Sequence, residues 1–244
     1  MSTLIILLAP LALCLSGFVS AQAQTCPEPL SDARRLILVT TASMTTFRAT
    51  VRLFERASVD TAWSPAGIPG PAVVGLSGLA WGQPFRNFVR GGEPFKIEGD
   101  KRTPAGVYRI GRSFGFVASS RPDYLRLETG RTVCVDDPSS TTYNTIASRA
   151  ELGSKIHGED MRGVALYRRG LVVDYPTDAA HRGGSCIFVH IWRTSNRGTV
   201  GCIALPEARV EALQGFAEGG AVIAILPLAA LDRFDGCLPE VSAP

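Results

Sequence analysis

A cysteine and a histidine twelve positions apart are the residues of this chain best suited to chemistry. His190 lies in the apolar run 187–192, and Cys202 follows the polar loop 193–198 and Gly201. A thiol becomes a strong nucleophile when a neighbouring base removes its proton, and imidazole is the natural partner. The spacing fits two adjacent strands joined by a loop. We therefore predict that His190 and Cys202 meet at one site.

The residues around this sulfur favour an acyl-transfer reaction. Gly201 has no side chain, so a substrate carbonyl can approach the sulfur, and the backbone N–H groups of Gly201 and Cys202 could receive the developing oxyanion. The alternative is a structural role, with His190 as a core histidine and Cys202 as a packing residue, because free cysteine is among the most buried residue types.

The N-terminus predicts an exported protein. Residues 4–19 are nearly all apolar, no charged side chain precedes Glu28, and an Ala-x-Ala site ends at Ala23. These features predict a signal peptide at residues 1–23, which leaves 24–244 as one domain in the periplasm or outside the cell. A membrane anchor is the alternative, but the apolar run is shorter than the roughly 20 residues of a membrane span. We expect no membrane span after cleavage.

Cysteine parity then predicts one free thiol. Five cysteines follow the signal peptide, and an odd count in an oxidising compartment leaves one of them unpaired or in an intermolecular bridge. Cys26 and Cys237 lie near opposite ends of the chain, and domain termini are often close in space. We predict a bridge between them and a second bridge between Cys134 and Cys186, which leaves Cys202 free.

Composition limits the classes of partner. The chain has 244 residues, a net charge of +3, 25 glycines and 16 prolines. This charge is too small to indicate a nucleic-acid binder, and the apolar content supports a turn-rich globular domain. We expect a monomer.

The elements that must position these residues are mostly short strands between Gly/Pro turns. This pattern predicts a mainly β fold, a sandwich or barrel of mixed strands with one or two short helices. One helix is predicted at 206–218, with Pro206 at its first position, and another within 142–159. A hairpin is predicted around 168–170. The predicted strands are 35–41, 72–76, 107–110, 124–127, 164–167, 171–175, 187–192 and 222–226.

The Thr199–Val200–Gly201–Cys202 segment, with His190 upstream, resembles the active-site signature of the YkuD-type L,D-transpeptidase catalytic domain. Residues 98–106 (EGDKRTPAG) are similar to the Gly-Asp…Thr-Pro-x-Gly segment of that family, and Cys134–Val135–Asp136–Asp137–Pro138, Tyr143–Asn144 and 185–191 resemble related secreted domains. The resemblance covers about residues 34–226.

The resemblance implies an acyltransferase that acts on peptidoglycan stem peptides. Cys202 would form a thioester and release D-Ala, His190 would be the base, and the carbonyl of Ile191 would orient the imidazole. Gly201 would complete the catalytic segment, and no cofactor is required. With water as acceptor the same site would be an L,D-carboxypeptidase. A catalytically silent wall-binding module is the alternative outside enzymes.

The chain departs from the family pattern at two positions. Val200 stands where the family usually has His, and Ala204 stands where it often has Arg, so the usual contacts to a substrate carboxylate are missing. Arginine binds carboxylates in a bidentate manner, so Arg182, Arg193 or Arg197 could replace them. The expected substrate-contacting residues are Thr199, Trp192, Arg193 and Arg197.

Two other readings of the histidines are weaker. A zinc site from His181, Cys186, His190 and Cys202 is disfavoured, because residues four apart on a strand lie about 13 Å from each other. The His157–Gly158–Glu159–Asp160 segment could hold an acid or base, but it is typical of a surface turn.

Overall fold

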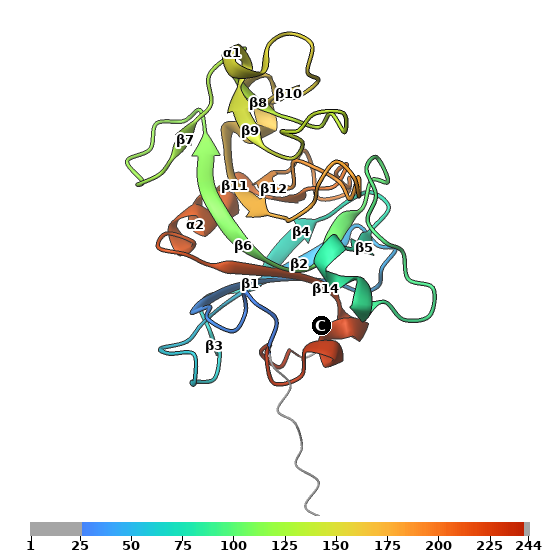
Figure 1. Ribbon diagram of the computed structural model, residues 1–244. Coiled ribbons are helices and arrows are strands. Elements are labelled where there is room, and N and C mark those ends of the chain that lie inside the picture. The colour runs from blue at the N-terminus through green and yellow to red at the C-terminus, as the bar shows by residue number, and fades with distance from the viewer. Residues whose placement is uncertain (1–25, 242–244) are drawn as a thin grey trace, which may run out of the picture.

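The computed structural model describes residues 26–241 and shows a closed β-sheet with a smaller sheet beside it (Figure 1). The predicted signal peptide at 1–23 lies outside the described residues. Within residues 26–241, no helix has the length and apolar character needed to cross a membrane.

Short strands dominate the described chain, as the turn-rich sequence predicts. There are two α-helices, α1 (Arg149–Leu152) and α2 (Glu207–Phe216), within residues 26–241. The described residues also form four 3-10 helices: η1 (Gln83–Phe88), η2 (Met161–Gly163), η3 (Ala165–Arg168) and η4 (Leu228–Phe234). The strands are β1 (Arg35–Thr41), β2 (Arg48–Glu55), β3 (Ser64–Pro65), β4 (Gly70–Val73), β5 (Leu79–Trp81), β6 (Thr103–Gly115), β7 (Leu125–Arg126), β8 (Thr132–Cys134), β9 (Ile146–Ser148), β10 (Glu159–Asp160), β11 (Arg169–Asp174), β12 (Phe188–Ile191), β13 (Ile203–Leu205) and β14 (Val222–Pro227).

Eight strands close into a barrel-like sheet. Their order is β1, β14, β6, β11, β12, β13, β4 and β2, and β2 pairs again with β1. The β1–β14 and β12–β13 pairs are parallel, whereas the other neighbours in this ring are antiparallel. The mainly β prediction is confirmed.

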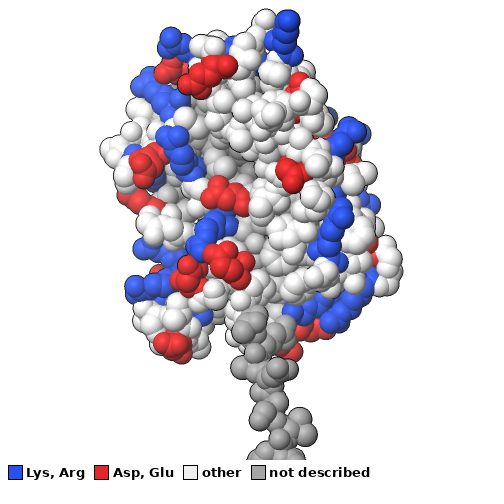
Figure 2. Space-filling view, in the orientation of Figure 1, with Lys and Arg blue, Asp and Glu red and all other residues white. Residues whose placement is uncertain are grey.

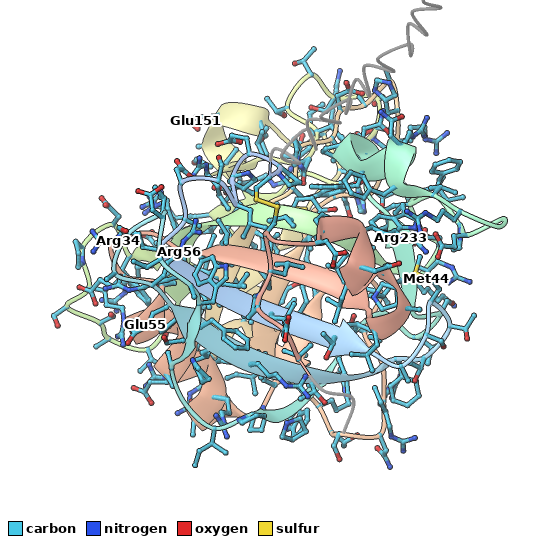
Figure 3. All side chains as sticks on the ribbon, turned by 90° about the horizontal axis from the view of Figure 1, so that it is seen from below. Arg34, Met44, Glu55, Arg56, Glu151 and Arg233 are labelled. Carbon is cyan, nitrogen blue, oxygen red and sulfur yellow. A yellow bond between two sulfur atoms is a disulfide. The ribbon has the colours of Figure 1, made fainter. Side chains whose placement is uncertain are left out.

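Strands β1 and β14 show how the sequence builds the main core. Both are almost continuously apolar and buried rather than alternating. Such runs fit strands that are covered on both faces. Leu30 from the N-terminal segment and Phe234 from η4 belong to the same buried cluster. Seen from below, Arg34, Glu55 and Arg56 lie toward one end of these strands, while Met44 and Arg233 lie toward the other (Figure 3).

A second, smaller core lies under the three-stranded sheet of β10, β8 and β9. It gathers residues from several separate elements, and the free cysteine is among them. Its buried members are Phe114, Leu127, Cys134, Met161, Tyr167, Phe188 and Cys202. The molecule therefore has one core that supports the barrel and another that surrounds the candidate nucleophile.

Several local predictions are wrong. The expected strand at 164–167 is the 3-10 helix η3, so the hairpin around 168–170 does not form, and β11 instead begins at Arg169. Tyr167 explains the difference, because its ring packs on Phe114 and Phe188 in the small core and this packing overrides strand propensity. The helix expected within 142–159 is only the single turn α1. Pro206 is the N-cap of α2 rather than its first residue.

The cysteine prediction is confirmed. Cys26 bonds to Cys237 and Cys134 bonds to Cys186, and Cys202 is the free cysteine of the described chain. Lys and Arg side chains are interspersed with Asp and Glu on the face in Figure 2, in keeping with the small net charge.

Candidate functional site

Strands β12 and β13 bring the predicted pair of residues together. The two strands are parallel neighbours, with Val189 opposite Ile203 and His190 opposite Ala204. Cys202 comes directly before β13, so its position continues this register beside β12. Parallel neighbours usually need a long crossover that contains a helix. Here a short irregular loop makes the connection and places both side chains in the wall of one cavity.

Thr199 holds the loop that carries the sulfur. Its hydroxyl donates to the Cys202 carbonyl at 2.6 Å and accepts from the Gly201 N–H at 3.1 Å. A second hydroxyl, that of Thr103, donates to the same carbonyl at 3.2 Å. The hydroxyl of Thr199 is thus engaged by the backbone, and the Gly201 N–H is engaged by Thr199. The backbone N–H of Cys202 is therefore the better candidate for an oxyanion donor.

His190 is fixed by the next residue in the chain. Its Nδ1 lies 2.8 Å from the Ile191 carbonyl oxygen, and the residue is only 7% exposed. A carbonyl can only accept, so Nδ1 carries the proton and Nε2 presents its lone pair. Burial lowers the pKa of His190 to about 4, although the Ile191 hydrogen bond opposes this shift. The imidazole is therefore neutral near pH 7.

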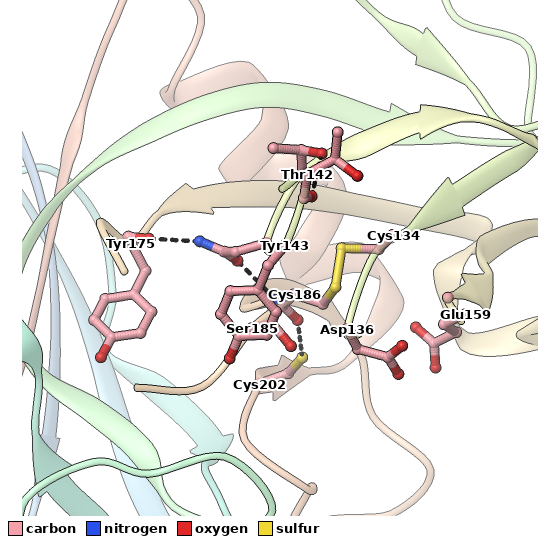
Figure 4. Close-up of a disulfide and its surroundings, with 12 residues drawn as sticks. Cys134, Asp136, Thr142, Tyr143, Glu159, Tyr175, Ser185, Cys186 and Cys202 are labelled. Carbon is pink, nitrogen blue, oxygen red and sulfur yellow. Dashed lines mark hydrogen bonds between the residues drawn. A yellow bond between two sulfur atoms is a disulfide. The ribbon is translucent and has the colours of Figure 1, made fainter. Parts of the chain in front are cut away.

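Cys202 is equally buried, at 5% exposure, and its thiol donates to the Cys186 carbonyl oxygen at 3.4 Å (Figure 4). Burial raises the pKa of Cys202 to about 12, and the negative charge of Glu159 adds to the rise. A hydrogen bond from the Phe188 backbone lowers this pKa in part. The resting site thus pairs a neutral thiol with a neutral imidazole.

Two cavities meet at the sulfur. The first, of about 370 Å³, is lined by His190, Arg193 and Arg197, and its rim includes Val200, which is 78% exposed. The second, of about 330 Å³, is lined by residues that include Glu98, Asp136 and Ser185. Both cavities share the same central residues. Those shared residues are Lys101, Glu159, Tyr167, Val200 and Cys202.

Cys186, which is bridged to Cys134, lines the second cavity. Cys186 has a φ of +56°, which is unusual for a residue other than glycine, and its N–H donates to Asn144 Oδ1 at 2.9 Å. The Asn144 amide also donates to the Tyr175 carbonyl at 2.8 Å (Figure 4). The bridge and Asn144 together fix the carbonyl that receives the thiol. A larger cavity of about 950 Å³ also borders the bridge but includes neither His190 nor Cys202, so size alone does not mark the site.

Some of the predicted residues lie away from the cavities that meet at Cys202. Trp192 lines neither of them, because β12 ends at Ile191 and the strand alternation stops there. Arg182 is also outside both linings, whereas Arg193 and Arg197 are in the first. Exposed His157 pairs with Asp136 on the surface, as a turn residue would.

The zinc alternative does not fit the structure. Cys186 is consumed by its bridge to Cys134, and His181 pairs with Asp178 at the surface. Within residues 26–241, no group of three or more metal-ligating side chains gathers in one place.

Sequence reasoning missed Tyr167, Glu159 and Lys101. The sequence predicts a strand at Tyr167 and favours a surface turn at Glu159, whereas the structure brings their side chains together at 2.8 Å beside Cys202. Lys101 falls in the segment that resembles the family, and this was the one available signal for it.

Comparison with known proteins gives a family match that includes the site residues. The YkuD family profile, described as the L,D-transpeptidase catalytic domain, matches residues 70–225. A search of curated proteins gives no match. Among solved structures, the chain is similar to the helical cell shape determining protein Pgp2 from Campylobacter jejuni, with 16% identity and a TM-score of 0.40. That similarity covers 80% of this chain and 48% of Pgp2, so the chain spans about half the length of that protein.

The profile match covers more than half of the chain, and it contains His190, Gly201 and Cys202 within one matched segment. The chain belongs to the YkuD family of L,D-transpeptidase catalytic domains.

Proposed function

We propose that the protein is an exported cysteine acyltransferase that acts on peptidoglycan stem peptides. The observation that carries this proposal is the state of Cys202, an unbridged thiol in a cavity wall shared with His190. Two disulfides support an oxidising compartment, in line with export. We propose residues 24–244 as a single catalytic domain that acts as a monomer and needs no cofactor.

The first half of the reaction is acylation. The Cys202 thiol gives its proton to His190 Nε2, and the sulfur attacks the carbonyl between the diamino acid and the terminal D-Ala. The electron pair of the carbonyl moves to oxygen, which the Cys202 N–H receives. When the carbonyl reforms, the C–N bond breaks, and the leaving amine of D-Ala takes the proton back from His190. A thioester remains on Cys202.

The neutral resting pair has a consequence for this step. A thiol with a raised pKa and an imidazole with a lowered one do not exchange a proton at rest. Transfer becomes favourable only as the new carbon–sulfur bond forms. The site would therefore be unreactive until a substrate carbonyl reaches the sulfur, which suits an enzyme in an oxidising compartment.

The second half of the reaction is transfer to an amine. An acceptor amine from another stem attacks the thioester and gives its proton to His190. The carbon–sulfur bond then breaks, and His190 passes this proton to the departing sulfur, so that Cys202 leaves as the thiol. The two cavities provide separate approaches to the sulfur. Arg193 and Arg197 in the first would attract a stem carboxylate, and Thr199 positions the loop between them.

The test is intact-mass analysis of the protein after incubation with a stem tetrapeptide that ends in D-Ala, with D-Ala release and crosslinked products measured in parallel. We expect a tripeptide acyl adduct on the wild type, and its absence from Cys202→Ala. The His190→Gln variant should acylate at least about a hundredfold more slowly. The surface variant His181→Gln is the matched control and should keep the wild-type rate.

The products separate the alternatives. Crosslinked stems with D-Ala release indicate transpeptidation, whereas D-Ala release alone indicates that water is the acceptor. A folded wild type that forms no adduct and releases no D-Ala would contradict the proposal and leave a wall-binding module.

A further inference from the structure

Tyr167 and Glu159 form a chain of polar groups that ends at the candidate nucleophile. The Tyr167 hydroxyl donates to Glu159 Oε1 at 2.8 Å. The Tyr167 ring packs edge-on against the His190 ring, with a centroid separation of 5.2 Å. Tyr167 and Cys202 belong to the same buried cluster, and both line the two cavities with Glu159. Tyr167 and Glu159 have no role in the acylation and transfer steps proposed above.

The elements that carry these groups are held rigidly. Glu159 is in β10, where it pairs with Cys134 of β8, and Tyr167 is in η3, where it packs against Phe114 and Phe188. Tyr167 is only 6% exposed, and its hydroxyl is hydrogen-bonded to Glu159 inside the site. The Glu159 carboxylate and the sulfur both line the cavities that Tyr167 lines.

The direction of this hydroxyl depends on the charge of Glu159. A carboxylate only accepts hydrogen bonds, so the Tyr167 O–H donates to an ionised Glu159. The phenol oxygen can then only accept a hydrogen bond from the thiol. A protonated Glu159 can donate to the phenol oxygen, which frees the Tyr167 O–H for the sulfur. Hydrogen bonds to a charged acceptor are about twice as strong as neutral ones, so a thiolate gains from this second arrangement.

We propose that Tyr167 and Glu159 are positioning residues for Cys202, and that a proton on Glu159 turns the Tyr167 hydroxyl from the carboxylate to the sulfur. This inference rests on the proposed role of Cys202 as nucleophile. Half-buried Glu159 exchanges its proton with solvent through the cavities, so the switch needs no other reactant. It also removes a negative charge from beside the sulfur as the thiolate forms.

Burial raises the pKa of Glu159, and nearby Asp136 adds to the rise, which brings protonation closer to neutral pH. Other charged or titratable groups surround the sulfur. Lys96 is neutralised by Asp100 at 2.7 Å, and His190 is neutral. The charged groups at the two cavities also include Lys101, Arg193, Arg197, Glu98 and Asp136.

The test is the rate at which iodoacetamide alkylates Cys202 at one fixed pH below the pKa of the thiol, where the rate follows the thiolate fraction. Glu159→Gln keeps the shape of the side chain, removes the charge and can donate to Tyr167. We expect this variant to react about tenfold faster than wild type, which corresponds to about one pKa unit. Tyr167→Phe alone should change the rate by no more than about twofold, because an ionised Glu159 already occupies the hydroxyl.

The double variant decides between a switch and a simple charge effect. With Tyr167→Phe in place, we expect Glu159→Gln to accelerate the reaction by only about twofold, since the hydroxyl is gone. Glu98→Gln removes another carboxylate of the second cavity, one that accepts from Tyr143 and Ser185, and should change the rate by less than about twofold. Thermal unfolding midpoints of all variants check that each is folded, and Cys202→Ala checks that the label is on Cys202.

An equal acceleration by Glu159→Gln in both backgrounds would overturn the switch and leave only charge repulsion. An unchanged rate in Glu159→Gln would overturn the contact altogether. Alkylation needs no stem peptide, so these outcomes do not depend on transpeptidation. Failure of the wild type to form an acyl adduct would instead count against the proposed function.

Discussion

The two disulfides lie in two different regions of the molecule, and they have different roles there. In the terminal region (residues 26–41 and 222–241), Cys26–Cys237 ties the ends of the described chain to the main core, where Cys237 packs with Leu30 and Phe234. In the site region (residues 132–205), Cys134–Cys186 lies in the small core with Cys202. One bridge closes a fold, and the other forms the wall of a site.

Their surroundings explain the difference. The terminal bridge spans 211 residues, so it restricts nearly the whole unfolded chain, but its sulfurs lie away from both cavities that meet at Cys202. The site bridge spans only 52 residues, yet the carbonyl of Cys186 accepts the hydrogen bond of the thiol. Loop length thus predicts which bridge contributes more to stability, and contact with Cys202 predicts which one affects activity.

Removal of the terminal bridge should have the largest effect on stability. The Cys26→Ala/Cys237→Ala variant loses a constraint on a 211-residue loop, and chain entropy predicts a loss of about 5 kcal/mol in the free energy of unfolding. Urea denaturation measures this loss. At low temperature the folded variant should acylate stem peptide at the wild-type rate. A folded variant that loses acylation would show that the terminal bridge also supports the site.

Removal of the site bridge should show the opposite pattern. The Cys134→Ala/Cys186→Ala variant should lose about 4 kcal/mol of stability, because its loop is shorter. Its acylation rate should fall by at least about tenfold under conditions where it remains folded, since Cys186 no longer holds its carbonyl at the sulfur. Single-turnover acylation, compared with the terminal variant at equal folded fraction, measures the difference.

Equal acylation rates in the two double variants would contradict this comparison. It would mean that Asn144 alone holds Cys186, through the 2.9 Å hydrogen bond to its N–H. The variant Asn144→Ala with the bridge intact is the matched measurement, because it removes the other half of the same support.

Both bridges could be predicted from the sequence, because the number of cysteines and their positions along the chain are known without the fold. The adjacency of His190 and Cys202 could also be predicted, because two apolar runs on either side of a short loop form neighbouring strands. The turn-separated apolar runs were likewise enough for the fold class, which the closed sheet confirms.

Tyr167 and Glu159 could not be predicted, for a physical reason. Residues 164–167 have the composition of a strand, and only the packing of Tyr167 against β6 and β12 makes a 3-10 turn there. Glu159 reaches the site because β10 pairs with β8. The packing of Tyr167 and the pairing of β10 with β8 both involve segments that are distant in sequence from the Cys202 motif. The local pattern of apolar residues therefore does not predict them.

Acid titration should reveal smaller differences in stability between the site region and the terminal region. The pKa of His190 is lowered by burial to about 4 in the folded protein, below its ordinary value of 6.5, so the unfolded chain binds a proton first. The stability contributed by neutral His190 is therefore present above pH 6.5 and is lost as the pH falls toward 4, by up to about 3 kcal/mol. Urea denaturation at a series of pH values measures this loss.

Arg233 of the terminal region and its ion-pair partner Glu93 should respond in a different pH window. Glu93 pairs with Arg233 of η4, and this hydrogen bond lowers the pKa of Glu93 to about 2 from 4.5. Its contribution is present above pH 4.5 and is lost only as the pH falls toward 2. We expect His190→Gln to remove the loss between pH 6.5 and 4 while keeping the loss below 4.5, and Glu93→Gln to do the reverse. The same loss between pH 6.5 and 4 in His190→Gln as in wild type would show that His190 is not held neutral in the folded protein, and the neutral resting pair in the site region would then be wrong.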